Sequence, residues 1–217
     1  MNRKSSRRRF LVAVLWGSGA ALGMAAPGAA AQTQRATPEL DRRVSRFLDA
    51  ERDRWDSLNV PYQDGKVLHD LAVRLGAKRI VEIGTSTGHS TIWLAWAAAK
   101  TGGKVTTIEI DRGRHARALA NFERAGVAEY VDARLGDAHE LVKTLPGPWD
   151  FVFHDADKGW SLQYFLDLDP KMAPGGCYTA HNVVRPARGC ASSSRACAAT
   201  RATRRASPRA RVPKGSR

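Results

Sequence analysis

Polar residues stand at the ends of five short hydrophobic runs. The five groups are Glu82-Ile83-Gly84-Thr85-Ser86-Thr87-Gly88-His89-Ser90, Glu109-Ile110-Asp111, Gly136-Asp137-Ala138, His154-Asp155-Ala156-Asp157-Lys158 and His181-Asn182. A β-branched run that breaks into a glycine-rich turn and then opens a helix is typical of a nucleotide-type cofactor pocket. Polar residues at the carboxyl ends of such strands face the crevice where ligands bind. The chemistry is therefore expected along one rim of a sheet.

The elements that must position these residues lie between residues 37 and 184. Hydrophobic spacing predicts helices at 37–58, 66–75, 90–100, 113–124, 138–145 and 160–168, and strands at 79–83, 105–110, 130–135, 151–154 and 177–180. Strands that alternate with helices of this length indicate a parallel sheet with right-handed crossovers. The predicted fold class is α/β, with a Rossmann-like sheet of five parallel strands.

Charge is distributed unevenly along the 217 residues, whose formal net charge is +14. Residues 1–35 hold six basic residues and no acid, and residues 185–217 hold nine Arg, one Lys and no acid. The segment 36–184 holds 19 basic and 21 acidic residues. A nucleic-acid interface needs a basic face on the folded part, so nucleic acid is not expected as a partner.

Residues 1–31 have the pattern of a twin-arginine export signal. Ser6-Arg7-Arg8-Arg9-Phe10-Leu11 precedes an apolar run that reaches about Ala26, and Ala29-Ala30-Ala31 resembles a cleavage site. The run is short and ends in Pro27-Gly28, which favours a cleaved signal over a permanent membrane anchor. We expect an exported protein, periplasmic or extracellular, that meets the membrane only through this signal, with residues 32–36 as a linker.

The basic tail 185–217 contains no Leu, Ile, Phe, Trp or Tyr. It cannot bury enough apolar surface to offset its ordering entropy, so disorder is expected. Docking of the tail on anionic polymers is a further interpretation, supported only by its charge. The composition also resembles GC-rich DNA translated in a wrong frame, which is a hypothesis of a frame-altered C-terminus.

The five groups resemble, in order and spacing, the class I S-adenosylmethionine-dependent O-methyltransferases of the cation-dependent catechol and caffeoyl-CoA type. The resemblance covers about residues 60–184. It implies transfer of a methyl group from S-adenosylmethionine to a hydroxyl of a small, catechol-like acceptor. The domain is expected at 37–184, without the antiparallel strands that end the family's sheet. The strand 177–180 is then an exposed edge.

The resemblance also implies where the cofactor is held. The first loop would hold its amino-acid end, Glu109 its ribose hydroxyls, and Asp137 with Ala138 the adenine. At Gly84 the missing side chain lets a ligand approach the backbone. The residues predicted to contact the cofactor are Glu82, Gly84, Thr85, Ser86, Gly88, Ser90, Glu109, Asp137, Ala138 and Asp155.

A divalent cation is implied by the same resemblance, with Asp155, His181 and Asn182 as ligands. The family has an Asp-Asn pair at the last two positions, so His181 is a departure. Imidazole removes a negative charge and prefers manganese or zinc to magnesium. Two interpretations stay open: a different metal, or a site that has lost its metal and uses His181 as a base.

Lys158 matches the family's general base, and with Asp155 it forms the predicted catalytic pair. A partly desolvated lysine near a cation can have its pKa pulled toward neutrality. The alternative for Lys158 is an ordinary surface lysine paired with Asp157. The alternative for the whole chain is a truncated, non-catalytic protein that binds the cofactor or another ligand. A homodimer is also left open.

Overall fold

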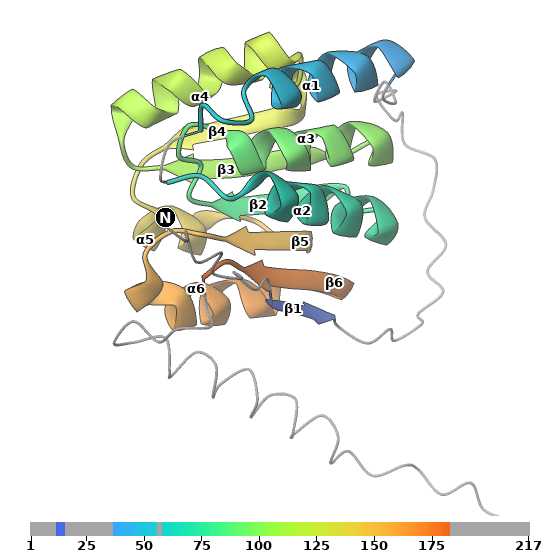
Figure 1. The fold of residues 1–217 in the computed structure, drawn as a ribbon. Coiled ribbons are helices and arrows are strands. Elements are labelled where there is room, and N and C mark those ends of the chain that lie inside the picture. The colour runs from blue at the N-terminus through green and yellow to red at the C-terminus, as the bar shows by residue number, and fades with distance from the viewer. Residues whose placement is uncertain (1–11, 16–36, 56–57, 183–217) are drawn as a thin grey trace, which may run out of the picture.

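The computed structural model describes residues 12–15, 37–55 and 58–182. Its six-stranded sheet has the order β1-β6-β5-β2-β3-β4 (Figure 1). The strands are β1 (Val12–Leu15), β2 (Arg79–Ile83), β3 (Lys104–Glu109), β4 (Val131–Leu135), β5 (Trp149–His154) and β6 (Met172–Ala180). Strands β2 to β6 run parallel to one another, which confirms the five-stranded parallel sheet of an α/β fold.

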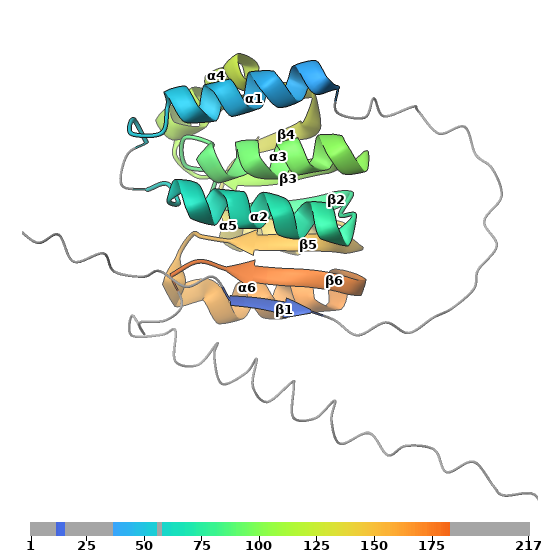
Figure 2. The ribbon, with the colours of Figure 1, turned by 45° about the vertical axis from the view of Figure 1, so that its right-hand side comes forward.

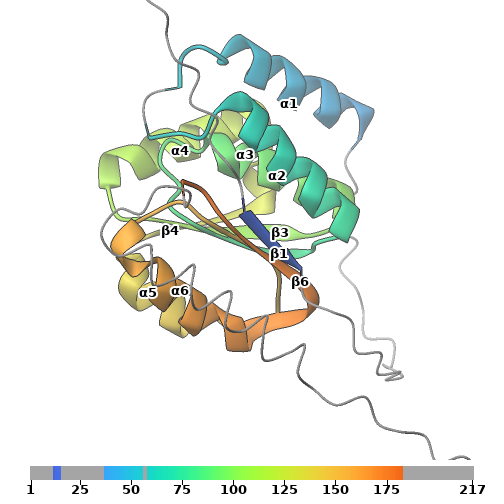
Figure 3. The same ribbon diagram turned by 60° about the horizontal axis from the view of Figure 1, so that its bottom comes forward.

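Helices cover both faces of the sheet (Figure 3). One face carries α1 (Pro38–Ala50), α2 (Tyr62–Leu75), α3 (His89–Thr101) and α4 (Arg112–Ala125). The other carries α5 (Ala138–Thr144) and α6 (Ser161–Leu168). Each layer has its own hydrophobic cluster against the sheet. Because both faces are covered, β2 is buried from Ile80 onward, as central parallel strands usually are.

Local signals explain where the helices begin and end. Thr37 caps α1, since its hydroxyl accepts the amide hydrogen of Leu40 at 3.2 Å, and Pro38 takes the first helical position. Gly76 ends α2 in the left-handed conformation, with a φ of 62°. Single 3₁₀ turns at Ala128–Tyr130, Lys158–Trp160 and Asp169–Lys171 complete the connections.

Three predicted boundaries are wrong. The first helix ends at Ala50 and does not reach Leu58, which lies 59% exposed beyond it. The polar run that follows Ala50 removes the apolar face, and Arg52 and Arg54 pair there with acidic residues. The second helix begins four residues earlier than predicted, at Tyr62. Strand β6 begins at Met172 and passes through a register shift, where a turn was expected before Cys177.

The expectation that β6 is an exposed edge is also wrong. Strand β1 pairs antiparallel with it, from Val12 opposite Ala180 to Leu15 opposite Cys177 (Figure 2). These four residues come from the predicted export signal. The other parts of the predicted signal, the linker 32–36 and the tail 185–217 lie outside the described residues. Within the part of the chain that the structure describes, no helix is long and apolar enough to cross a membrane.

Candidate functional site

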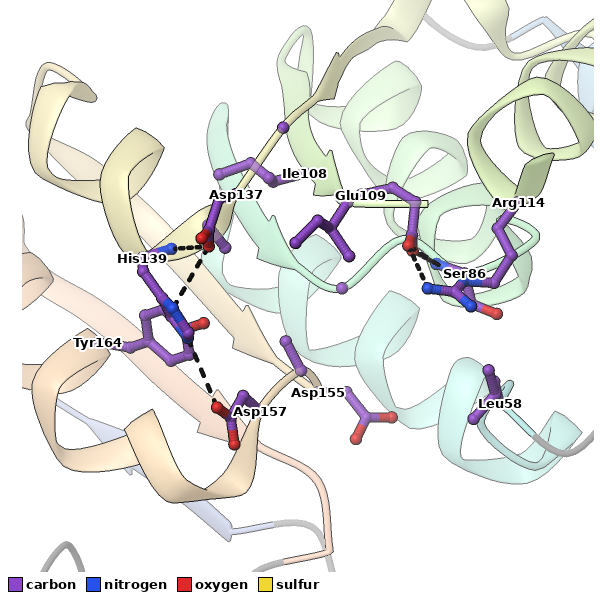
Figure 4. Close-up of a pocket in the computed structure, with 15 residues that line it drawn as sticks. Leu58, Ser86, Ile108, Glu109, Arg114, Asp137, His139, Asp155, Asp157 and Tyr164 are labelled. Atoms are coloured by element: carbon purple, nitrogen blue, oxygen red, sulfur yellow. Dashed lines mark hydrogen bonds and ion pairs between the residues drawn. The ribbon is translucent and has the colours of Figure 1, made fainter. Parts of the chain in front are cut away.

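A cavity of about 440 Å³ opens at the carboxyl ends of the parallel strands (Figure 4). The predicted cofactor residues that line it are Gly84, Ser86, Glu109, Asp137, Ala138 and Asp155. They come from the ends of β2, β3, β4 and β5, so the structure brings four of the five polar groups to one rim. Glu82, Thr85, Gly88 and Ser90 do not line the cavity and are buried behind its wall or beside it.

The turn after β2 has a backbone shape that requires glycine. Gly84 has a φ of 100°, and a Cβ there would lie 2.9 Å from the carbonyl oxygen of Asp155. The backbone at the end of β5 therefore approaches Gly84 too closely for a side chain to fit there. The same missing side chain leaves room for a ligand. Gly88 has a φ of 96°, and its Cβ would meet the Phe122 ring at 2.6 Å.

Ser86 leaves a polar atom available at this turn. Its φ is 51°, and its amide hydrogen is donated to Oε2 of Glu109 at 2.8 Å. Its hydroxyl oxygen is buried and has no hydrogen-bond partner among the described residues. Because Ser86 lines the cavity, this hydroxyl is placed to meet a polar ligand group.

Glu82 is completely buried under the turn. Its Oε2 accepts hydrogen bonds from the hydroxyls of Thr107, at 2.6 Å, and Thr91. Its Oε1 is buried without a partner in the described part of the chain. Burial raises the pKa of Glu82 to about 7, against the hydrogen bonds that favour its charged form. Glu82 therefore supports the floor of the site and keeps one oxygen unpaired.

Glu109 ends β3 as predicted and is held on both oxygens. Oε1 accepts from the guanidinium of Arg114, at 2.7 and 3.0 Å, and from the amide of Asp111 at 2.9 Å. Oε2 accepts from the amide of Ser86 (Figure 4). The Asp111 carboxylate, which stands in the same polar group as Glu109, caps α4 by accepting from the Arg114 amide at 2.7 Å.

A histidine lies between two carboxylates on the opposite wall of the cavity. His139 approaches Asp137 at 3.4 Å through Nδ1 and Asp157 at 3.5 Å through Nε2 (Figure 4). Its ring stacks on Trp160, with centroids 3.8 Å apart. Asp137 also caps α5, accepting the amide hydrogen of His139 at 2.9 Å. This wall presents flat aromatic surface beside a carboxylate.

Asp155, at the end of β5, pairs with two cationic side chains. Its Oδ1 lies 2.6 Å from Nζ of Lys158, so Lys158 pairs with Asp155 and not with Asp157 as in the alternative interpretation. Its Oδ2 lies 3.2 Å from Nδ1 of His181. Burial alone would raise the pKa of Asp155, but His181 and Lys158 outweigh it and hold that pKa below its usual value.

His181 follows β6 and bridges to a residue far away in the sequence. Its Nε2 lies 2.9 Å from Oδ2 of Asp64, in the first turn of α2. The ring is 1% exposed, and Nδ1 is close to Asp155 but poorly aligned for a hydrogen bond. Burial alone would lower the pKa of His181, but Asp155 and Asp64 raise it above its usual value.

The residues predicted to bind a divalent cation do not fit one. Asp155 and His181 come together, but as an ion pair. Asn182 is exposed, with a φ of 60°. Across the described ranges, no three His, Cys, Asp or Glu side chains are grouped as a metal site. The donors that a shared ion needs are engaged with each other.

Sequence reasoning missed several residues of the site, among them His139 and Tyr164, which line the cavity. Asp64 resembles an ordinary acidic residue in the first turn of a helix. Arg114 has no motif around it, although its place five residues after Glu109 on the next helix could have indicated the contact. Leu58 was assigned to a helix face and instead lines the cavity.

Residues 37–187 match the family model described as O-methyltransferase. The chain belongs to this family. Within it, the chain is 38% identical over 133 residues to a catechol O-methyltransferase of Niastella koreensis, a match that covers 59% of this chain and 60% of that protein. It is 32% identical over 127 residues to caffeoyl-CoA O-methyltransferase 1 of Eucalyptus globulus, covering 56% and 51%. The chain thus spans between half and two thirds of the length of these family members.

A solved structure of the same family has a similar fold. The O-methyltransferase TomG of Streptomyces achromogenes, solved in complex with SAM, superposes with a TM-score of 0.61 at 34% identity. The superposition covers 71% of this chain and 75% of TomG. The expected membership of the S-adenosylmethionine-dependent O-methyltransferases of catechol and caffeoyl-CoA type is confirmed.

Proposed function

We propose that this protein transfers the methyl group of S-adenosylmethionine to a hydroxyl of a small acceptor of the catechol class. The observation that carries the proposal is the cavity itself, lined by Glu109 and Ser86 on one side and reaching Asp155 on the other. Solved O-methyltransferases of the family bind this cofactor. The acceptor class follows from the catechol O-methyltransferase among the relatives.

The chain offers matching groups for each end of the cofactor. The unpaired Ser86 hydroxyl suits the amino-acid end. The Glu109 carboxylate can accept the ribose hydroxyls once the Arg114 guanidinium moves away from Oε1 of Glu109. Asp137 and Ala138, which line the cavity, would border the adenine. The cofactor supplies an electrophilic methyl group on a sulfonium.

Lys158 is the proposed base, and Asp155 positions it. Lys158 takes the proton of the acceptor hydroxyl, and Asp155, at 2.6 Å, stabilises the ammonium that forms. The oxygen lone pair then forms the C–O bond as the C–S bond breaks. The electron pair stays on sulfur, which leaves S-adenosylhomocysteine and the methylated acceptor.

Calorimetric titration of the full-length protein with S-adenosylhomocysteine tests the cofactor half. Glu109→Ala should weaken binding at least about tenfold, because hydrogen bonds to a charged group are worth about 1.5–3 kcal/mol. Glu140→Ala, an exposed glutamate paired with Lys143, is the control. Absence of saturable binding would overturn the proposal.

Formation of S-adenosylhomocysteine with a panel of catechols tests the transfer itself. Turnover with a catechol supports the enzyme. Binding without turnover on any acceptor would favour the alternative, a protein that binds the cofactor without catalysis.

Export by the twin-arginine route is part of the same proposal. An exported methyltransferase needs a supply of a cofactor that is made in the cytoplasm, or it carries one bound molecule for a single turnover. Replacing Arg7 and Arg8 by Lys should abolish export in cell fractionation, whereas Arg3→Lys should not. The homodimer stays a prediction, which light scattering on the purified protein would test.

A further inference from the structure

We propose that methyl transfer by this chain needs no divalent cation, because the His181 ring occupies the space between the carboxylates of Asp64 and Asp155 and pairs with both. The inference rests on the proposed methyltransferase function and concerns the acceptor side of that site. It selects neither a different metal nor a histidine base, the two interpretations that the sequence left open.

The His181 ring faces its two carboxylates through different nitrogens. Nε2 is 2.9 Å from Asp64, and Nδ1 is 3.2 Å from Asp155. The two nitrogens of an imidazole point in divergent directions, so a single ion cannot bind both. An ion that shared the ring with one carboxylate would leave the other carboxylate out of reach. The ligand atoms of these three side chains therefore point away from any common centre, whereas the ligand atoms of a metal site must point toward one ion.

Both oxygens of Asp155 face positive side chains. Lys158 lies 2.6 Å from Oδ1, and His181 lies beside Oδ2. A cation that bound this carboxylate would have to displace one of them. The His181 side chain is 1% exposed, and its backbone amide hydrogen is donated to the carbonyl of His154 at 3.0 Å.

The two carboxylates already face basic side chains of the chain itself. His181 lies between Asp64 and Asp155, and Lys158 lies beside Asp155. A divalent ion would therefore enter a partly buried site whose carboxylates are already paired, which is costly. An aspartate in place of His181 would instead replace this basic ring by a third carboxylate, which a divalent cation could neutralise.

Manganese binding to the full-length protein tests the inference without cofactor or acceptor. The electron paramagnetic resonance signal of free Mn²⁺ should be undiminished by the wild-type protein. His181→Asp should bind one Mn²⁺ at least about tenfold more tightly than wild type, the scale on which ligand-shell changes alter metal affinity. His115→Asp is the matched control, on α4 at the opposite edge of the sheet, and should bind as wild type does.

Stoichiometric Mn²⁺ binding by the wild type would overturn the inference. So would a folded His181→Asp protein, by circular dichroism, that binds no Mn²⁺. If that variant does not fold, the wild-type titration decides alone.

Turnover provides a second readout. Wild-type activity should be the same in EDTA and in added Mg²⁺ or Mn²⁺, and that of His181→Asp should depend on the cation. Wild-type activity that EDTA abolishes and Mg²⁺ restores would overturn the inference. Failure of the proposed function has a different signature, since the protein would then not bind S-adenosylhomocysteine in any of these buffers.

Discussion

The two halves of the site treat their carboxylates differently. On the cofactor side, Glu82 is held by neutral hydroxyls, and one of its oxygens has no partner among the described residues. On the acceptor side, Asp155 has a positive side chain at each oxygen. The cofactor side thus holds its buried carboxylate with neutral donors, whereas the acceptor side pairs its carboxylate with the chain's own basic side chains. A shared fold can preserve one half of a site while the other changes its electrostatics.

Loss of the proposed base should give the largest effect and would show that the acceptor side is catalytic. Lys158→Met should lower kcat by roughly a thousandfold, within the usual range for general base catalysis, and leave S-adenosylhomocysteine affinity unchanged. Steady-state kinetics with calorimetry measures both. Lys143→Met is matched, since Lys143 also pairs with an acid three residues away. A decrease of less than about tenfold would remove Lys158 from the mechanism.

The cofactor side should differ from the acceptor side in how the buried Glu82 makes the free energy of unfolding depend on pH. Its pKa is about 7 in the folded state against 4.5 as the reference, so the folded state binds the proton more tightly. The resulting stability is present below pH 4.5 and is lost as the pH rises through about 7. The free energy of unfolding of the wild type should fall by about 3 kcal/mol relative to Glu82→Gln across this range.

Urea denaturation at several pH values measures that difference. Glu140→Gln, on the surface of α5, should follow the wild-type profile. Parallel profiles for the wild type and Glu82→Gln would contradict the assignment.

Neutralising the bridge on the acceptor side should cost less. His181→Gln keeps a polar side chain but leaves Asp64 and Asp155 without its charge, and it should lower the free energy of unfolding by about 2 kcal/mol, since both carboxylates are partly exposed. His115→Gln provides the comparison in the same denaturation assay. Equal stability of the two variants would show that the bridge contributes little.

The smallest expected effect concerns the competition for Glu109. Arg114 donates to the oxygen that the ribose hydroxyls would take, so Arg114→Met should tighten S-adenosylhomocysteine binding about fivefold, as for loss of a pair worth about 1 kcal/mol. Arg117→Met on the same helix serves as control. Weaker binding by Arg114→Met would instead place the guanidinium in contact with the cofactor.

The cofactor side was predictable because its signals are local. Glu82 and Glu109 stand at the ends of β-branched runs. The hydrophobic pattern of each run shows where its strand ends, and so places each glutamate at a strand end. The turn around Gly84 needs its glycine for reasons that act within one loop and its neighbouring strand. Pattern and structure therefore agree that Gly84, Ser86 and Glu109 share this rim.

The acceptor side depends on contacts that no local pattern encodes. Asp64 and His181 are 117 residues apart and meet only because α2 packs across the sheet from β6. The end of α1 was missed for a different reason. Helical spacing continues to Leu58, but the chain leaves the helix at Ala50 without a glycine to indicate it. Long-range packing decided the first outcome, and the polar run after Ala50 decided the second.

Strand β1 makes the rim dependent on a peptide that proteolysis could release. Its four residues add backbone pairs to Cys177–Ala180, just before His181. While the chain is intact, this strand is tethered to the sheet and its local concentration there is high. A cut after Ala31 would turn the same contact into an encounter between two molecules, which dilution opposes. Processing at that point would then leave β6 to hold the histidine with one neighbouring strand.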